Sequence, residues 1–308
     1  MEKLASDTDE MMTRDECEER CAMTPLPVGE SMKKYAMQIA YDGTDFCGWQ
    51  IQRGKGVHAN LKPSIQGTLA SAIKQMCGAD VSIVGSGRTD AGVHASGQVA
   101  HFRLETDRYP PGNLLKGLNG ILPASIQIHR LGRVADDFHA QRMALKKQYS
   151  FYFHQGLCHV PQLYPYTRWV RRPLDGEKMQ EALQYLLGEH DFLPFRASGA
   201  KVTGTVRTLY EAEVTRLAVP QPGCFDPDEP FLWRVRLVGS GFLKQMVRGI
   251  AGTLQQIGEG RRSPSDMREI LQTQDRQKVG PTAPARGLWL DRVWYPSHLG
   301  LDILHSEP

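Results

Sequence analysis

The chain has 308 residues, of which 41% are hydrophobic and 23% are charged, and its formal net charge is +3. This balance favours a globular protein with one large domain or two and a sizeable core. No apolar run approaches the ~18 residues that a membrane-spanning helix needs, so the sequence excludes the transmembrane class.

The charge is unevenly distributed along the chain. Residues 1–30 contain nine acidic and three basic residues, whereas 34 basic and 25 acidic residues give residues 31–308 a charge of +9. A basic body favours a polyanionic partner. The acidic start resembles neither a secretory signal nor a mitochondrial presequence. We therefore expect residues 1–33 to be a disordered acidic extension and the protein to be cytoplasmic.

The cysteine and histidine patterns give no sign of a metal site. Only Cys17 and Cys21 are close together among the six cysteines. No second pair stands at the spacing of zinc ligands, and no HExxH pattern is present. The sequence predicts reduced thiols in a cytosolic protein.

Aromatic and β-branched residues mark the strands that we expect. In chain order these strands are residues 35–41, 98–104, 125–131, 148–154, 209–214, 231–239 and 287–295. Apolar residues at helical spacing predict the helices. The predicted helices are 65–76 with Ser64 as N-cap, 179–187 between the N-cap Asp175 and the closing Gly188, 242–257, and a shorter helix near Ser263-Pro264.

Strands and helices follow one another without the regular alternation of a parallel sheet. The sequence therefore predicts an α+β fold, with helices on one face of a mixed, mainly antiparallel sheet. Two similar strand–helix sets, over 34–140 and 141–298, predict two halves that meet along a continuous sheet. Residues 219–230 are rich in Pro and Gly and predict a loop, and residues 299–308 are a tail.

The segment GSGRTDAGVHASGQ, residues 85–98, concentrates four glycines, Arg88 and Asp90. The glycines indicate sharp turns or close approach of the backbone to a neighbour. The segment lacks the GxxxxGK[ST] and GxGxxG patterns of phosphate and dinucleotide loops. A single carboxylate is too few for a metal loop. Asp-Ala-Gly is also ordinary turn sequence, so a structural turn and a catalytic loop both stay open.

Arg88 and Asp90 are two positions apart, so both side chains project to the same face of an extended segment. A neighbouring guanidinium favours the ionised carboxylate and holds it in one orientation. Such an arrangement suits a nucleophile or a general base mounted on a rigid turn.

The stretch GRTDAGVHASGQVAHF closely resembles the signature of the TruA-type tRNA pseudouridine synthases. Further matches follow in the family's order at residues 41–50, 117–126, 136–140, 186–197, 242–254 and 287–296. The resemblance covers about residues 34–298. It implies the two-half pseudouridine synthase fold and isomerisation of uridine to pseudouridine in the anticodon stem-loop of tRNA, at positions 38–40 of the RNA. It also implies a homodimer without cofactor or metal.

The chain departs from the family pattern in three places. Gln141 stands where many relatives carry an arginine, so a phosphate contact is in doubt there. Residues 53–63 form a longer link than usual, and the acidic extension is additional.

The resemblance assigns three residues to the reaction. Asp90 is the expected catalytic residue, and it either attacks C1′ or deprotonates C2′ of the ribose. Arg88 is expected to orient Asp90 and to fill the space that the flipped base leaves. Tyr149 is expected to stack on the uracil and to relay the C5 proton, although its strand position also suits a core residue.

Three basic residues are expected to contact RNA. Lys244 and Arg248 are four apart on the predicted 242–257 helix, so they share a polar face suited to phosphates or to an active-site carboxylate. Arg207 is a further RNA contact. All three also fit a solvated basic face. His94 is expected only to fix the loop.

Two other functions remain open. An RNA-binding module without catalysis would explain the basic body, but it would not explain Arg88 and Asp90 mounted on glycines. A nucleoside hydrolase would use Asp90 on the same glycosidic bond and would release free uracil.

Overall fold

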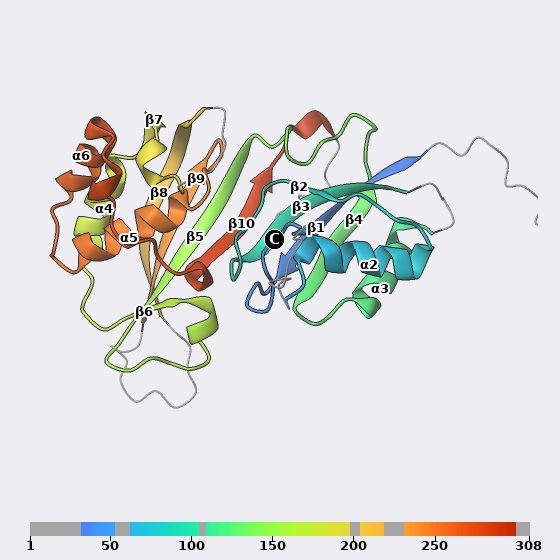
Figure 1. The fold of residues 1–308 in the computed structure, drawn as a ribbon, viewed down its shortest axis with the longest axis horizontal. Helices are drawn as coiled ribbons and strands as arrows, with labels where there is room; N and C mark the ends of the chain where they lie inside the picture. Colours follow the sequence, from blue (N-terminus) through green and yellow to red (C-terminus); the bar gives the residue numbers. More distant parts are fainter. Residues whose placement is uncertain (1–31, 53–61, 105–108, 198–203, 219–230, 300–308) are drawn as a thin grey trace, which may run out of the picture.

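The computed structural model describes residues 32–52, 62–104, 109–197, 204–218 and 231–299 (Figure 1). The predicted loop at 219–230 lies outside these residues. So do the acidic extension apart from residues 32–33, the long link apart from residues 62–63, and the tail apart from residue 299.

Among the described residues, ten strands form one sheet with the order β4-β1-β3-β10-β5-β9-β8-β7, while β2 pairs with β3 and β6 with β5. The strands are β1 Lys33–Tyr41, β2 Val84–Gly85, β3 His94–Leu104, β4 Ile126–Arg133, β5 Lys146–Gln155, β6 Arg168–Val170, β7 Gly188–Asp191, β8 Val206–Ala218, β9 Phe231–Gly239 and β10 Leu288–Trp294. Only the pairs β3–β10 and β5–β6 are parallel in this sheet. The predicted α+β class with a mainly antiparallel sheet is confirmed.

The sheet is continuous because β10 lies between strands from distant parts of the chain (Figure 1). It pairs with β3 only at Trp289–His94 and Leu290–Ala95, and it pairs with β5 along most of its length. Gly97 is required next to this join, because a Cβ on it would lie 2.1 Å from the carbonyl oxygen of Asp291.

Two groups of helices lie beside the sheet, one next to each of its two parts (Figure 1). The α-helices are α2 Ile65–Cys77, α3 Pro111–Ile121, α4 Gly176–Gln184, α5 Met246–Gly258 and α6 Ser265–Thr273, and the short 3₁₀ helices are η1 Tyr164–Tyr166, η2 Leu193–Phe195, η3 Arg276–Lys278, η4 Ala285–Gly287 and η5 Ser297–Leu299. Helices α2 and α3 accompany the strands of residues 33–133, and α4, α5 and α6 accompany the later strands. No helix of the described part is long and apolar enough to cross a membrane.

The predicted N-caps are confirmed. Ser64 Oγ accepts the Gly67 N–H at 3.1 Å, and Asp175 Oδ1 accepts the Lys178 N–H at 3.0 Å. The predicted end of the second helix is wrong, because α4 ends at Gln184 and Gly188 instead begins β7 with φ 92°.

The start of α5 also differs from the prediction. The helix begins at Met246 rather than at 242, because Gln245 is left-handed with φ 63° and ψ 4°. A right-handed helix cannot continue through that conformation. Lys244 is therefore outside the helix, and the expectation that it shares a helical face with Arg248 is wrong.

Aromatic side chains fill much of the core. Phe151 and Phe153 on β5 are fully buried, and Tyr35 stacks on Phe102 with ring centroids 5.5 Å apart. Tyr149 is on the same strand and is only 7% exposed. The core thus extends along β5 as far as Tyr149, which lines a cleft.

Candidate active site

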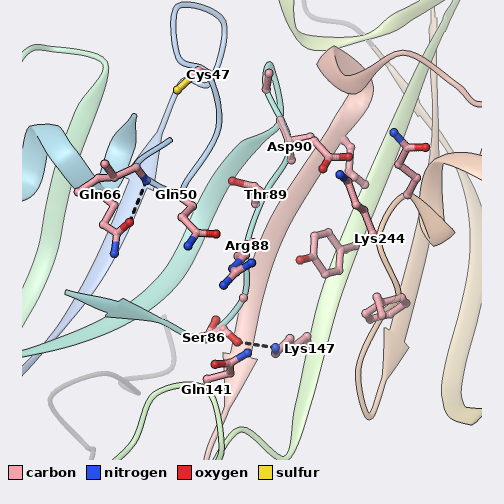
Figure 2. Close-up of a pocket in the computed structure, with 18 of the residues that line it drawn as sticks. Cys47, Gln50, Gln66, Ser86, Arg88, Thr89, Asp90, Gln141, Lys147 and Lys244 are labelled. Carbon is pink, nitrogen blue, oxygen red and sulfur yellow. Dashed lines mark hydrogen bonds between the residues drawn. The ribbon is translucent and has the colours of Figure 1, made fainter. Parts of the chain in front are cut away.

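A large open cleft of about 1510 Å³ lies near the join of the two parts of the sheet (Figure 2). Its walls include residues 86–91 after β2, Lys147 and Tyr149 on β5, and residues 242–248 at the start of α5. Ordinary small-molecule pockets measure about 300–1,000 Å³. The cleft is therefore large enough for a nucleotide that belongs to a polymer.

The loop that carries Asp90 is held from two sides. Thr89 Oγ1 lies 2.9 Å from Tyr41 Oη on β1, and the Thr89 carbonyl accepts the Trp49 N–H at 3.0 Å. A turn follows, in which the Val93 N–H donates to the Asp90 carbonyl at 3.1 Å. Gly92 has φ 76°, a conformation that favours glycine. Asp90 is thus presented on a fixed turn, as the sequence predicts.

The carboxylate of Asp90 is paired with Arg248 from α5. Arg248 Nη1 donates to Asp90 Oδ2 at 3.1 Å, and Arg248 Nε donates to the Ala283 carbonyl at 2.7 Å. The side chains are 15% exposed for Arg248 and 28% for Asp90. The second bond fixes the plane of the guanidinium, so Arg248 holds the carboxylate in one orientation.

The predicted pair between Arg88 and Asp90 is wrong. Arg88 lines the cleft and is exposed, but it has no hydrogen bond or ion pair with any residue that the structure describes. Figure 2 shows its side chain turned away from the Asp90 carboxylate. Arg248, which folding brings in from the far part of the chain, occupies the position expected for Arg88. The guanidinium of Arg88 is therefore available to a bound molecule.

Tyr149 lies at the inner wall of the cleft. Its ring packs edge-on against Phe242, with centroids 5.0 Å apart, and a Cβ on Gly87 would lie 4.0 Å from its hydroxyl. Burial raises the pKa of Tyr149, and the nearby charge of Asp90 acts in the same direction. The hydroxyl is therefore protonated near neutral pH, so it can donate or relay a proton.

Lys147 is a cleft residue that the sequence analysis missed. It lies two positions before Tyr149 on β5, and its Nζ donates to the Ser86 carbonyl at 2.6 Å (Figure 2). Burial lowers the pKa of Lys147 to about 8, and the positive charge of Arg207 contributes to the shift. The i, i+2 spacing from Tyr149 could have identified it, because alternate residues of a strand share a face.

The remaining predicted residues lie in different places. Lys244 and Gln141 are exposed and line the cleft, whereas Arg207 is not among its lining residues (Figure 2). Arg207 Nη1 instead donates to the carbonyl of Val206 at 2.6 Å. His94 is fully buried, and its Nδ1 accepts the Gly43 N–H at 3.1 Å.

No group of three or more His, Cys, Asp or Glu side chains within the described residues is placed to hold a metal ion. The polar side chains that line the cleft are hydroxyl, amide and basic groups around the single carboxylate of Asp90, and apolar residues such as Ile83 and Phe242 complete its walls.

Comparison with known proteins defines the class. The profile of the tRNA pseudouridine synthase family matches residues 37–141 and 182–296, so the chain belongs to this family. Among individual relatives, tRNA pseudouridine synthase A 1 of Desulfotalea psychrophila is 38% identical over 270 residues, which cover 86% of this chain and 100% of the relative. The tRNA pseudouridine synthase A of Brevibacillus brevis is 40% identical over 264 residues, with the same coverage of both chains.

Proposed function

We propose that this protein isomerises uridine to pseudouridine in the anticodon stem-loop of tRNA, at positions 38–40 of the RNA. The observation that carries the proposal is the Asp90–Arg248 pair in a cleft large enough for a polymer-bound nucleotide. Membership in the family and the names of the relatives, which are tRNA pseudouridine synthases, support it.

Asp90 is the proposed catalytic residue. Uridine and pseudouridine are isomers: the N1–C1′ bond breaks, C5 bonds to C1′, C5 loses its proton and N1 gains one. The ionised carboxylate either forms an ester at C1′, which C5 then displaces, or takes the C2′ proton and later returns it. Both routes use the Asp90 carboxylate that Arg248 orients. The overall reaction balances without an oxidant, a reductant or a co-substrate, so we propose that it needs neither cofactor nor metal.

The other cleft residues have supporting roles in this proposal. Arg88 fills the space that the target base leaves when it flips out of the helix. Tyr149 stacks on the uracil and relays the C5 proton. Lys244, Arg207 and Arg248 are the proposed basic contacts on the RNA-facing side, and Arg248 also orients the Asp90 carboxylate to which it donates.

We further propose two halves, with residues 34–140 carrying the RTDAGVH loop and residues 141–298 completing the site. The acidic extension 1–33 and the tail 299–308 lie outside both halves. A homodimer in the cytoplasm is the proposed working state, and the basic body and the tRNA substrate of the family support this location.

The test is to incubate the protein with unmodified tRNA and to map pseudouridine at single-nucleotide resolution. We expect product at uridines 38–40 of the RNA. Binding of tRNA without product would favour a binding module instead. Release of free uracil would favour a nucleoside hydrolase.

A further inference from the structure

Residues 156–174, between β5 and α4, form a basic and aromatic surface that the reaction described above does not use. They contain Arg168, Arg171 and Arg172, two tyrosines and a tryptophan, and no acidic residue. They lie between the two ranges that match the family profile. Arg171 and Arg172 are exposed.

Three rings of this segment lie in a row, and the guanidinium of Arg286 lies at one end of it. The Arg286 guanidinium carbon lies 4.2 Å from the centroid of the Tyr164 ring. The Tyr164 ring is 5.5 Å from that of His159, which is 5.8 Å from that of Trp169. Tyr164 is 45% exposed, and His159 is exposed as well. These three rings are named the aromatic row, and the exposed ring surface of Tyr164 and His159 is available for bases to pack against.

The aromatic row is fixed before any partner binds. Trp169 Nε1 donates to the Gly156 carbonyl at 2.9 Å, and Thr167 Oγ1 donates to the Leu163 carbonyl at 2.8 Å. Arg286 Nε donates to the Thr167 carbonyl at 3.1 Å. A surface that is already ordered loses little conformational entropy on binding.

The aromatic row starts beside the catalytic loop. In the chain, Arg286 stands between Ala283 and Leu288. The Ala283 carbonyl accepts from Arg248, and Leu288 lines the cleft. A Cβ on Gly92, two residues after Asp90, would lie 3.5 Å from the Cβ of Ala285. Residues 283–288 therefore connect the wall of the Asp90 cleft to the aromatic row.

We propose that the aromatic row binds unpaired nucleotides next to the target uridine, with bases stacked on Tyr164 and His159 and phosphates held by Arg171, Arg172 and Arg286. Stacking on aromatic rings combined with basic side chains is the usual way to bind single-stranded nucleic acid without reading its sequence. The inference rests on the proposed function, because it identifies where the substrate strand leaves the active site.

The test measures affinity for fluorescently labelled, unmodified tRNA by anisotropy, at several salt concentrations. Tyr164→Leu should weaken binding about tenfold because it removes one stacking ring, while Tyr164→Phe should stay within about twofold of the parent. Replacing Arg171 and Arg172 by Gln should weaken binding and lower the slope of log affinity against log salt by about one to two. Arg268→Gln is the matched control, because Arg268 on α6 lies over the ring of Tyr185, the C-cap residue of α4, at 4.7 Å.

Two results would overturn the proposal: parent-like affinity in both Tyr164→Leu and the double arginine variant, or equal losses in Tyr164→Leu and Tyr164→Phe. If circular dichroism shows that Tyr164→Leu does not fold, the affinity measurement on this variant is replaced by photocrosslinking of 4-thiouridine tRNA to the parent protein. A crosslink within residues 156–174 supports the surface, and crosslinks only elsewhere overturn it. Pseudouridine formation by the parent is scored separately, so a failure of the proposed function is distinguishable from a failure of the surface.

Discussion

Arg248 Nη1 lies 3.1 Å from Asp90 Oδ2, although the two residues are 158 positions apart in the chain. Asp90 follows β2 in the first part of the sheet, and Arg248 is in the first turn of α5 in the second part. The charged centre of the cleft therefore forms only when both parts are folded and joined. The ion pair links the integrity of the fold directly to the proposed chemistry.

Arg248→Ala should reduce turnover about 10- to 100-fold, because it removes a charge-assisted hydrogen bond to the reacting carboxylate. The Arg248 side chain is only 15% exposed and donates to Asp90 and to the Ala283 carbonyl, so the slope of log tRNA affinity against log salt should stay unchanged. Single-turnover kinetics and salt titrations separate these quantities. A flatter salt dependence in the variant would instead make Arg248 a direct phosphate contact.

Asp90→Asn should abolish turnover and leave tRNA affinity within a few-fold of the parent. The amide preserves the size of the side chain but cannot supply the anion that either proposed route needs. Mass-neutral conversion of uridine is measured by chemical mapping of pseudouridine. Asp80→Asn is a suitable control, since Asp80 is exposed and pairs with Lys74 at 2.9 Å. Product formation by pure Asp90→Asn protein would contradict its assigned role.

Tyr149→Phe should keep tRNA affinity and lose at least about tenfold in single-turnover rate, because general acid–base help is typically worth 10²–10⁴. The ring remains able to stack, so only the proton relay is removed. Tyr210→Phe, on an exposed part of β8, is the control. A Tyr149→Phe rate within about threefold of the parent would reduce the residue to a stacking platform.

Lys147 should make the stability of the protein depend on pH. Its pKa is lowered from 10.5 to about 8 in the fold, so between these values the unfolded chain binds more protons than the folded protein. Stability linked to this group therefore rises as the pH increases from about 8 to 10.5, and it is constant below 8. Urea unfolding of the parent and of Lys147→Met at pH 7, 8, 9 and 10 checks the prediction. Above pH 8, the free energy of unfolding of the parent should rise relative to that of Lys147→Met. A difference between the two proteins that does not change with pH would show that the pKa of Lys147 is not lowered.

Gly97→Ala should destabilise the protein by about 1–3 kcal/mol, because the added Cβ would overlap the Asp291 carbonyl at the join of β3 and β10. Gly112→Ala on α3 is the control, since a Cβ there meets nothing within 4 Å. It should be neutral or stabilising by up to ~1 kcal/mol. Thermal unfolding of both variants checks the contrast, and equal midpoints would show that β10 moves to accommodate the methyl group.

Local features of the fold could be predicted from the sequence. Ser64 and Asp175 cap their helices through residues three positions away, and every predicted strand overlaps an observed one. Helix α3 was missed because the three glycines in PGNLLKGLNGI weaken the helical signal. The start of α5 was placed too early because nothing in the apolar spacing indicates a left-handed Gln245.

The candidate site was also predictable only in part, because its residues come from distant parts of the chain. The loop with Asp90 stands out because its glycines and charged residues are adjacent in sequence. The partner of Asp90 was predictable only as one of two possibilities: the sequence leaves open whether Arg248 meets phosphates or an active-site carboxylate, and the fold brings it to Asp90, whereas sequence proximity favours Arg88. Lys147 could have been found only through its i, i+2 spacing from Tyr149 on β5, since a basic residue at the start of a strand is usually solvated.

The position of β10 also has a consequence for folding during synthesis. It is the last strand in chain order among the described residues, yet it fills an internal place between β3 and β5. Until it emerges from the ribosome, both neighbours present unpaired backbone groups along one edge. Exposed strand edges of this kind are sites of mispairing between chains. The nascent protein is therefore most exposed to such mispairing just before β10 is inserted, and Leu288 of β10 joins the wall of the Asp90 cleft in the same step.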